Sequence, residues 1–209
     1  IIYYAIKPHK ELNELLLSKS KDNLIATLTD LLTSYINDKN SSSLREYITV
    51  TIAGYQHNPK KLGYNGFKQN SEIEGKPIAC EAKPKNIQTS GYEERKTKLK
   101  LNGDGGFNDY TIERLKKDIK EDFNLLSSGF IDGELQYILE FPFYVISKQL
   151  KKQLPKKRII GTYTRMASFN FSHYAHYPNI KIVYLNRQAI EKNKRYFNKN
   201  LYQFLIEYK

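Results

Sequence analysis

A carboxylate and an ammonium stand two residues apart in Glu81-Ala82-Lys83, at the end of an apolar stretch that begins at Pro77. Because side chains on a strand alternate between two faces, Glu81 and Lys83 would share one face, with Cys80 and Ala82 on the other. A carboxylate beside an ammonium can bind a divalent cation and assist attack on a phosphodiester. The spacing therefore predicts a site for phosphoryl chemistry on this strand.

The acid-x-Lys pattern recurs in this chain, and only its context separates one occurrence from the others. The matches are Glu74/Lys76, Glu81/Lys83, Glu94/Lys96, Asp118/Lys120 and Glu207/Lys209. The match at Asp118 lies on an expected helix, where residues two apart point in different directions. The others, apart from Glu81/Lys83, fall in a turn, in a charged loop and at the C-terminal end. Glu81 and Lys83 follow an apolar strand, although a solvated edge ion pair worth about 0–1 kcal/mol has the same sequence.

Helices are expected before this strand. Apolar spacing predicts them over 8–19 and 22–37, the second with Asp22 as its N-cap. The capping-box spacing of Ser43 and Glu46 opens a third helix, which reaches about Tyr55. The residues expected on its buried side are Leu44, Tyr47, Ile48 and Ile52.

Turns and hairpins are expected around the strand itself. Glycine, asparagine and proline punctuate 54–67, and a β-hairpin is predicted over 71–83, around Glu74-Gly75-Lys76. Residues 86–110 form a long polar loop with a short strand near Thr97–Leu101. A loop of this length is usually functional or mobile.

The second half of the chain continues the alternation of helix and strand. Thr111 predicts the N-cap of a helix to about Leu126, with Ile112, Leu115, Ile119 and Phe123 facing inward. Asp132-Gly133 predicts a second hairpin within 129–145. Residues 159–164 and 180–185 read as strands, and 187–208 as a closing helix.

One α/β (α+β) domain over 1–209, with a mixed sheet flanked by helices, is the expected architecture. Residues 1–57 would form a helical N-terminal layer, 58–145 a catalytic core, and 146–209 the C-terminal strands and helix.

The composition favours an anionic partner. The net charge is +12 in 209 residues, which suits nucleic acid first and an acidic membrane surface second. Cys80 is the one cysteine, so an intrachain disulfide and a thiolate zinc cluster are excluded, and a reducing, intracellular setting is expected. No stretch approaches the ~20 apolar residues of a membrane span. The chain begins at Ile1 without methionine, so we expect a few residues to precede it, and IIYYAI is short for a secretory leader.

Glu81-Ala82-Lys83 and the upstream turn Leu62–Phe67 together resemble the core of the PD-(D/E)xK nucleases, the fold of many type II restriction endonucleases. The resemblance covers about residues 62–86. It implies a restriction-endonuclease-like fold in which two acids and a main-chain carbonyl, here that of Ala82, hold Mg2+. Lys83 would lie near the attacking water.

The chain departs from that pattern at Asn65, which stands where the family has an aspartate. Asn65 is a natural variant, or an engineered change from aspartate, or the first acid is instead Glu72, which the hairpin would place diagonally from Glu81. Asn65-Gly66 is also a favoured turn by itself. Glu46 is a further candidate, because a helix before the core supplies an extra carboxylate in some of these nucleases.

The resemblance implies a Mg2+-dependent, sequence-specific endonuclease of double-stranded DNA in the cytoplasm of a prokaryote or of a virus-infected cell. A palindromic site would call for a homodimer, and a restriction-modification system would add a DNA methyltransferase. The candidate DNA-binding residues are Lys85, Asn86, Gln88, Lys98, Lys100, Asn102, Asn108, Arg165, Asn170 and His173. A non-catalytic nucleic-acid-binding protein and a repair or junction-resolving nuclease are the alternatives.

Overall fold

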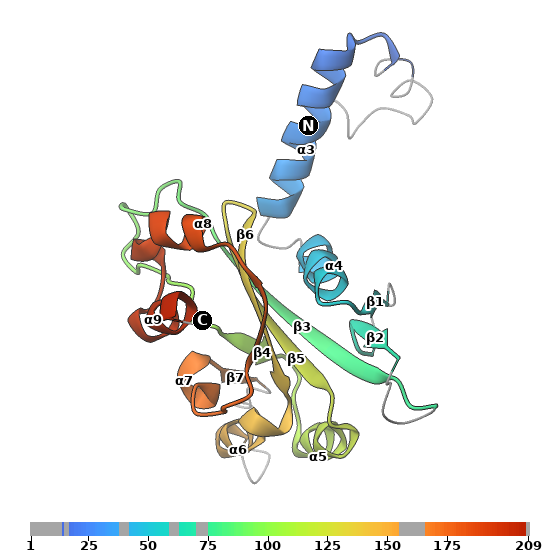
Figure 1. Ribbon diagram of the computed structural model, residues 1–209, viewed down its shortest axis with the longest axis vertical. Helices are drawn as coiled ribbons and strands as arrows, with labels where there is room; N and C mark the ends of the chain where they lie inside the picture. The colour runs from blue at the N-terminus through green and yellow to red at the C-terminus, as the bar shows by residue number, and fades with distance from the viewer. Residues whose placement is uncertain are drawn as a thin grey trace, which may run out of the picture.

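The computed structural model describes residues 14, 17–37, 42–58, 63–69, 75–154 and 166–207 (Figure 1). Its helices are α3 (Lys21–Asn37), α4 (Ser42–Ile52), α5 (Ile112–Glu121), α6 (Tyr144–Gln153), α7 (Phe171–Tyr174), α8 (Arg187–Lys192), the 3-10 helix η1 (Lys194–Tyr196) and α9 (Lys199–Glu207). Its strands are β1 (Gln56–His57), β2 (Gly66–Lys68), β3 (Ile78–Ile87), β4 (Gly105–Phe107), β5 (Asn124–Ile131), β6 (Glu134–Pro142), β7 (Ala167–Phe169) and β8 (Lys181–Leu185). The helix predicted over 8–19 and the strand predicted over 159–164 fall largely or wholly outside the described residues.

A six-stranded mixed sheet in the order β1-β2-β3-β5-β6-β8 forms the centre of the fold. β3 and β5 run parallel, and the other neighbouring pairs in this sheet are antiparallel. β4 and β7 form a second, two-stranded antiparallel sheet. The predicted α+β class, a mixed sheet flanked by helices, is therefore confirmed.

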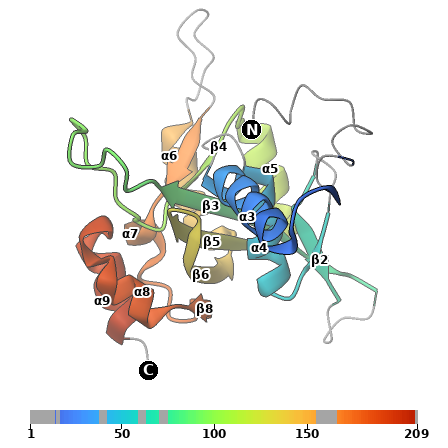
Figure 2. The ribbon, with the colours of Figure 1, turned by 90° about the horizontal axis from the view of Figure 1, so that it is seen from above.

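The two faces of the sheet carry hydrophobic cores of unequal size. On one face Cys80, Ala82 and Leu126 pack beneath Val50 of α4. The opposite face carries the larger core, to which α5, α6, α7, α8 and α9 contribute Leu115, Ile146, Leu150, Tyr174, Ile190, Leu201 and Leu205. Seen from above, α4 and the α8–α9 pair accordingly lie on opposite sides of the sheet (Figure 2).

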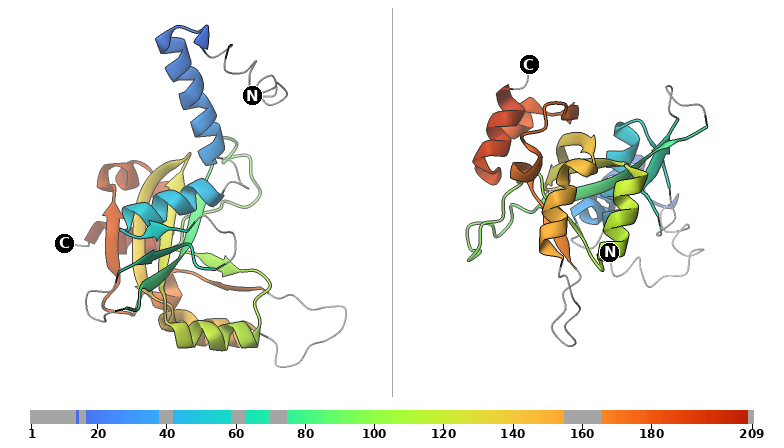
Figure 3. Two further views of the ribbon diagram at one scale, coloured as in Figure 1. Left: turned by 90° about the vertical axis from the view of Figure 1, so that its right-hand side faces the viewer. Right: turned by 90° about the horizontal axis from the view of Figure 1, so that it is seen from below.

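α3 confirms the helix predicted at 22–37, although its cap and its surroundings differ from expectation. Ser20 Oγ accepts a hydrogen bond from Asn23 N (3.4 Å), so Ser20 caps the helix and Asp22 lies in its first turn. On its apolar face, Ile25 and Leu32 are 53% exposed. The helix leads away from the sheet (Figure 3) instead of covering it.

α4 buries a different side from the one that its apolar residues predict. The side chains that it buries are Arg45, Thr49 and Val50. Tyr47 and Ile52, which were predicted to be buried, are 49% and 44% exposed. The hydroxyl oxygens of Thr49 and Ser128 on β5 lie 2.7 Å apart and share a hydrogen bond, on the same side of the helix as Val50, which packs into the smaller core.

The second predicted hairpin is confirmed, and the first only in its second strand, which is the start of β3. The strand that pairs with β3, in the register Gly66↔Cys80, is β2 at Gly66–Lys68, in a segment that was predicted as turns. Residues 71–74 of the predicted hairpin lie outside the described residues. In the second, β5 and β6 meet at Asp132 and Gly133, whose φ angles of 48° and 81° are those of the mirror-image turn that Asp-Gly favours.

Thr111 is confirmed as the N-cap of α5, since its hydroxyl accepts a hydrogen bond from Arg114 N (3.2 Å). The predicted end of this helix at Leu126 is wrong. Asp122 adopts a left-handed φ of 42°, which stops the helix at Glu121. The apolar residues that follow form β5, which is buried almost throughout.

Two further differences, and one confirmation, concern the loop and the C-terminal part. The strand predicted at 97–101 is wrong, because only Leu101 forms a bridge, with Phe197. The strand predicted at 180–185 is confirmed as β8. The closing helix predicted over 187–208 divides into α8, η1 and α9, with breaks at Asn193 and Phe197. No helix in the described part of the chain combines the length and apolar character that crossing a bilayer requires.

Candidate active site

β3 presents Glu81 and Lys83 as the alternation predicts. Lys83 Nζ donates a hydrogen bond to Glu81 Oε1 (2.8 Å), and the two side chains are only 17% and 15% exposed. Cys80 and Ala82 point into the smaller core on the other face, where burial raises the pKa of the Cys80 thiol to about 12. The pair is therefore sheltered by the fold, unlike the solvated edge pair that the sequence left open.

β4 provides the shelter over Lys83. A Cβ placed on Gly105 would lie 2.8 Å from both Cβ and Cγ of Lys83, so only glycine permits this approach. The ammonium of Lys83 also lies 4.4 Å from the centre of the Phe107 ring, a cation–π contact. The glycine-rich stretch 103–106, which resembles no phosphate loop, thus packs against the lysine.

Asn65 lies where β2 separates from β3. Its backbone N donates a hydrogen bond to Cys80 O (3.0 Å), and its Oδ1 accepts one from Ala82 N (2.8 Å). The side chain of Asn65 thus replaces the next backbone hydrogen bond between β2 and β3. Since Gly66 is opposite Cys80, Asn65 is opposite Glu81. The structure therefore brings together Asn65, Glu81 and the backbone of Ala82.

Glu46 joins this cluster from α4. The helix already begins at Ser42, so Ser43 is not its N-cap and Glu46 does not occupy the capping-box position. Instead Glu46 Oε2 accepts a hydrogen bond from Asn65 Nδ2 (3.3 Å). An amide suits this place well, because it offers an acceptor to a backbone N–H and a donor to a carboxylate.

Asp118 is an acidic neighbour of this cluster that the acid-x-Lys pattern does not single out, because it lies on a helix. It is buried on α5, where it accepts a hydrogen bond from the Tyr110 hydroxyl (2.7 Å). Burial raises the pKa of Asp118, and the negative charges of Glu81 and Glu121 add to that rise. Asp118 lies three residues after the buried Leu115, so helical spacing places both on the inward side of α5. Ile119, which was predicted on that side, is instead 43% exposed. This spacing was the signal in the sequence for a buried acid.

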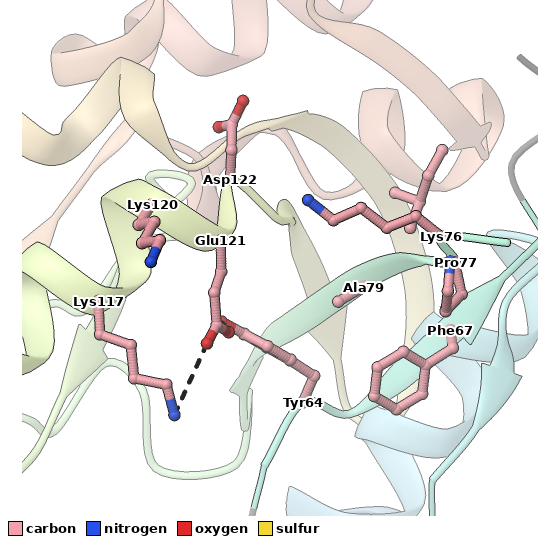
Figure 4. Close-up of a pocket in the computed structure, with 10 residues that line it drawn as sticks. Tyr64, Phe67, Lys76, Pro77, Ala79, Lys117, Lys120, Glu121 and Asp122 are labelled. Carbon is pink, nitrogen blue, oxygen red and sulfur yellow. Dashed lines mark hydrogen bonds and ion pairs between the residues drawn. The ribbon is translucent and has the colours of Figure 1, made fainter. Parts of the chain in front are cut away.

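A hollow of about 760 Å3 opens between α5 and the β2–β3 hairpin and reaches Ala79, two residues before Glu81 on β3 (Figure 4). Its lining residues are Tyr64, Phe67, Lys76, Pro77, Ile78, Ala79, Lys117, Lys120, Glu121 and Asp122. Tyr64 donates a hydrogen bond to Glu121. Burial raises the pKa of this tyrosine above its ordinary value, and the hydrogen bond raises it further. Sequence reasoning named none of these residues as site residues, because they come from segments about forty residues apart.

A second hollow, of about 360 Å3, opens at the other end of β3. Three predicted DNA-binding residues, Lys85, Asn86 and Gln88, line it together with Arg45 and Arg95. Lys85 forms an ion pair with Asp104 (3.2 Å). The Glu81–Lys83 pair thus lies on the strand that links two hollows.

The other predicted DNA-binding residues are scattered. Lys98 is held by Glu93 (2.7 Å), and Lys100 and Asn108 are exposed. Asn102 is partly buried beneath the start of α7, where its backbone O accepts from Phe171 N (2.8 Å).

Asn170 and His173 are engaged with each other, in a capping box at the start of α7. Asn170 N donates to His173 Nδ1 (3.0 Å), and burial lowers the pKa of this histidine. Arg165 and Glu72, the alternative first acid, lie outside the described residues.

The oxygen donors around Asn65 are of the kind that Mg2+ prefers. Within the described ranges no group of three or more His, Cys, Asp and Glu side chains is gathered as a metal site. A cation at this place would therefore draw on the Glu81 carboxylate, the Asn65 amide and the Ala82 carbonyl, and Oδ1 of Asn65 keeps a lone pair beyond the one that Ala82 N uses. The donor set fits the ion by chemistry, with less negative charge than two aspartates would give.

Comparisons with family models, with curated proteins and with solved structures found no match to this chain.

Proposed function

We propose that this protein is a Mg2+-dependent endonuclease of double-stranded DNA, with a restriction-endonuclease-like core and the sequence specificity of type II restriction enzymes. One observation carries the proposal. The Glu81–Lys83 pair lies sheltered on β3, directly opposite Asn65, at the point where β2 leaves β3. The side chains of Lys83 and Glu81 remain 17% and 15% exposed at this place, which is where we expect a phosphate to bind.

The charge of the chain supports DNA as the substrate. The net charge is +12, and lysines and arginines line both hollows along β3. Phosphate contacts of this kind fix the position of a duplex without reading its sequence. Asn86 and Gln88, at the second hollow, carry the amide groups that pair with adenine edges.

Each residue of the cluster has a distinct role in the proposed hydrolysis. Glu81, Asn65 and the Ala82 carbonyl would hold Mg2+, with Glu46 orienting the Asn65 amide. When bound, the ion polarises the scissile phosphate and lowers the pKa of a coordinated water. Lys83 stabilises the negative charge that develops on the phosphate as water attacks phosphorus and the P–O bond breaks. The attacking water gives up one proton to the solvent, and the leaving oxygen takes up one.

A palindromic target would be bound by two copies of this chain, one for each half-site. A homodimer is therefore the form that we propose for the active enzyme, with a DNA methyltransferase as the partner activity that protects host DNA.

The test is digestion of plasmid and phage DNA of known sequence with Mg2+. We expect discrete fragments whose ends share one sequence, and no cleavage after the metal is removed with EDTA. Glu81→Ala and Lys83→Ala should each lower the rate by about 10²–10³-fold or more.

Two other results would contradict the proposal. Tight binding of DNA without cleavage in any divalent metal would make the protein a non-catalytic nucleic-acid-binding module. Cleavage of branched DNA only would make it a junction-resolving enzyme.

A further inference from the structure

The hollow between α5 and the β2–β3 hairpin has no role in the hydrolysis proposed above. We infer that it binds one unstacked nucleotide of the DNA, next to the phosphate at Glu81 and Lys83. This inference rests on the proposed function, since the nucleotide belongs to the strand that the enzyme would cleave.

The hollow is large and apolar enough for a nucleobase. Its volume of about 760 Å3 lies within the range of small-molecule sites, roughly 300–1,000 Å3. Phe67, Pro77, Ile78 and Ala79 form its sheet side, opposite Lys117 and Glu121 (Figure 4). Bases stack readily on aromatic rings whatever their identity.

Two aromatic side chains give this wall different properties. Tyr64 is fixed, because its hydroxyl bonds Glu121 and its ring packs on Phe123 with centroids 4.6 Å apart. Phe67 meets the edge of Tyr64 at 6.3 Å and is 38% exposed, an unusual exposure for a phenylalanine. Phe67 therefore presents apolar surface to the hollow while Tyr64 holds it in place.

The rim of the hollow is basic. Lys117 pairs with Glu121 (3.7 Å), and the same carboxylate accepts the Tyr64 hydroxyl, so its charge is engaged. Lys76 and Lys120 make no ion pair with the described residues. An apolar wall, with ammonium groups at its edge that make no ion pair among the described residues, suits an aromatic ring attached to a phosphate, which is the chemistry of a nucleotide.

The position along β3 fits a nucleotide adjacent to the cleaved bond. Ala79, in the wall, precedes Glu81 by two residues on the same face of the strand. Two strand residues span about 6.6 Å, a distance that one nucleotide can bridge. Unpairing a base costs energy, least at mismatches and strand ends, and the stacking on Phe67 with the contacts from Lys120 would offset that cost.

The first experiment measures binding of deoxyadenosine 5′-monophosphate to the full chain without Mg2+, by saturation-transfer NMR and equilibrium dialysis. Lys120→Ala and Phe67→Ala should each weaken binding at least fivefold. Lys116→Ala is the matched control, because Lys116 is exposed on the same helix and does not line the hollow. Deoxyadenosine without its phosphate should bind less tightly than the nucleotide.

The second experiment follows 2-aminopurine, a base whose fluorescence rises when it leaves the stack. It is placed at each position flanking the cut in a duplex and bound to Glu81→Ala protein. Emission should rise at one flanking position, and the rise should be lost when Lys120→Ala is added but kept with Lys116→Ala.

The inference is overturned if the nucleotide binds equally to all variants, or if 2-aminopurine stays quenched at every flanking position. A protein that cleaves DNA and gives either result retains the proposed function and loses this one. A protein that binds the nucleotide through Lys120 and Phe67 but cleaves no DNA loses the proposed function and keeps the nucleotide site, without its place next to a cleaved bond.

Discussion

Two Glu–Lys pairs lie in the same sheet of this protein, on opposite faces. Glu81 and Lys83 are joined at 2.8 Å, and Glu140 and Lys68 at 3.0 Å. Glu81 shares its register with Leu125 of the larger core, whereas Glu140 is opposite Leu126 of the smaller core. Distance alone does not distinguish the two pairs.

The carboxylates differ in how fully they are occupied. Glu140 Oε1 accepts hydrogen bonds from Tyr55, Lys68 and Asn124, and Lys181 lies 3.6 Å from Oε2. Within the described part of the chain, Glu81 receives a hydrogen bond from Lys83 alone. Three donors on Oε1 fix Glu140 in the fold, although its Oε2 is buried without a hydrogen-bond partner among the described residues. Glu81 has a single donor, Lys83. We therefore propose that Glu140 serves stability and Glu81 serves the chemistry.

The same isosteric substitution in both places gives the largest expected contrast. Glu81→Gln should lower DNA cleavage by about 10²–10³-fold, because it removes charge from the metal and phosphate site. It should lower the free energy of unfolding by about 1 kcal/mol, because it weakens one hydrogen bond, to Lys83. Glu140→Gln should lower the free energy of unfolding by about 1.5–3 kcal/mol, the worth of a hydrogen bond to a charged group, with cleavage per folded molecule unchanged. Cleavage rates and urea denaturation measure the two quantities. Equal losses of activity in both variants would end the distinction between the pairs.

Gly105 tests how closely Lys83 must be held. Gly105→Ala forces a Cβ to within 2.8 Å of the Lys83 side chain and 2.6 Å of Phe169 Cζ, and we expect about 10- to 100-fold slower cleavage from the displaced ammonium. Gly106→Ala is the control, since the nearest atom to its Cβ would be Ala167 O at 3.7 Å, an ordinary contact. The rates are measured at saturating DNA. If the two alanine variants cleave equally fast, the contact with β4 has no bearing on the reaction.

Asn65 tests the role of Glu81 in a different way, because the residue at this position sets the negative charge of the proposed metal site. Asn65→Asp adds a carboxylate to the donor set, and the Mg2+ concentration for half-maximal cleavage should fall about tenfold. Without metal the new carboxylate would face Glu46, so the melting temperature in EDTA should fall and recover with Mg2+. Asn179→Asp adds the same charge at an exposed position and should change neither quantity. An unaltered Mg2+ requirement would indicate Glu72 as the partner of Glu81.

These pairs also show how far the sequence can be read. Glu81 and Lys83 are two residues apart, so strand alternation alone places them on one face, and the structure agrees. The Glu140 network joins Lys68, Tyr55 and Asn124 across as many as 85 residues. A local sequence pattern cannot predict such a long-range contact. The one local indication was Glu140 itself, a glutamate within an apolar strand.

The same limit explains the error in α4. Apolar periodicity selected the side with Tyr47 and Ile52, but the helix packs with the side of Thr49, which bonds Ser128. The spacing of apolar residues predicts which side of a helix is buried in an apolar core, but it does not predict a polar contact between distant segments. The Asp132-Gly133 hairpin turn and the Thr111 cap were predictable because their physics is local to a few residues.

The dependence of stability on pH gives the smallest and most specific test of the Glu140 assignment. Burial alone would raise the pKa of Glu140, but the hydrogen bonds from Tyr55 and Lys68, with the charges of Lys68 and Lys181, outweigh it and hold the pKa below its ordinary value. A carboxyl with a lowered pKa in the folded state contributes stability above the unfolded pKa of about 4.3 and loses it as the pH falls through the folded pKa. The difference in unfolding free energy between wild type and Glu140→Gln should therefore be full at pH 7 and narrow below about pH 4.3. The pKa of Asp118 is raised, mainly by burial, so its ionised form destabilises the folded state and the effect of pH has the opposite sign. The unfolding free energy of wild type should therefore rise relative to that of Asp118→Asn as the pH falls. Urea midpoints from pH 3 to 7 measure both differences, and parallel curves for the two variants would contradict the assignment.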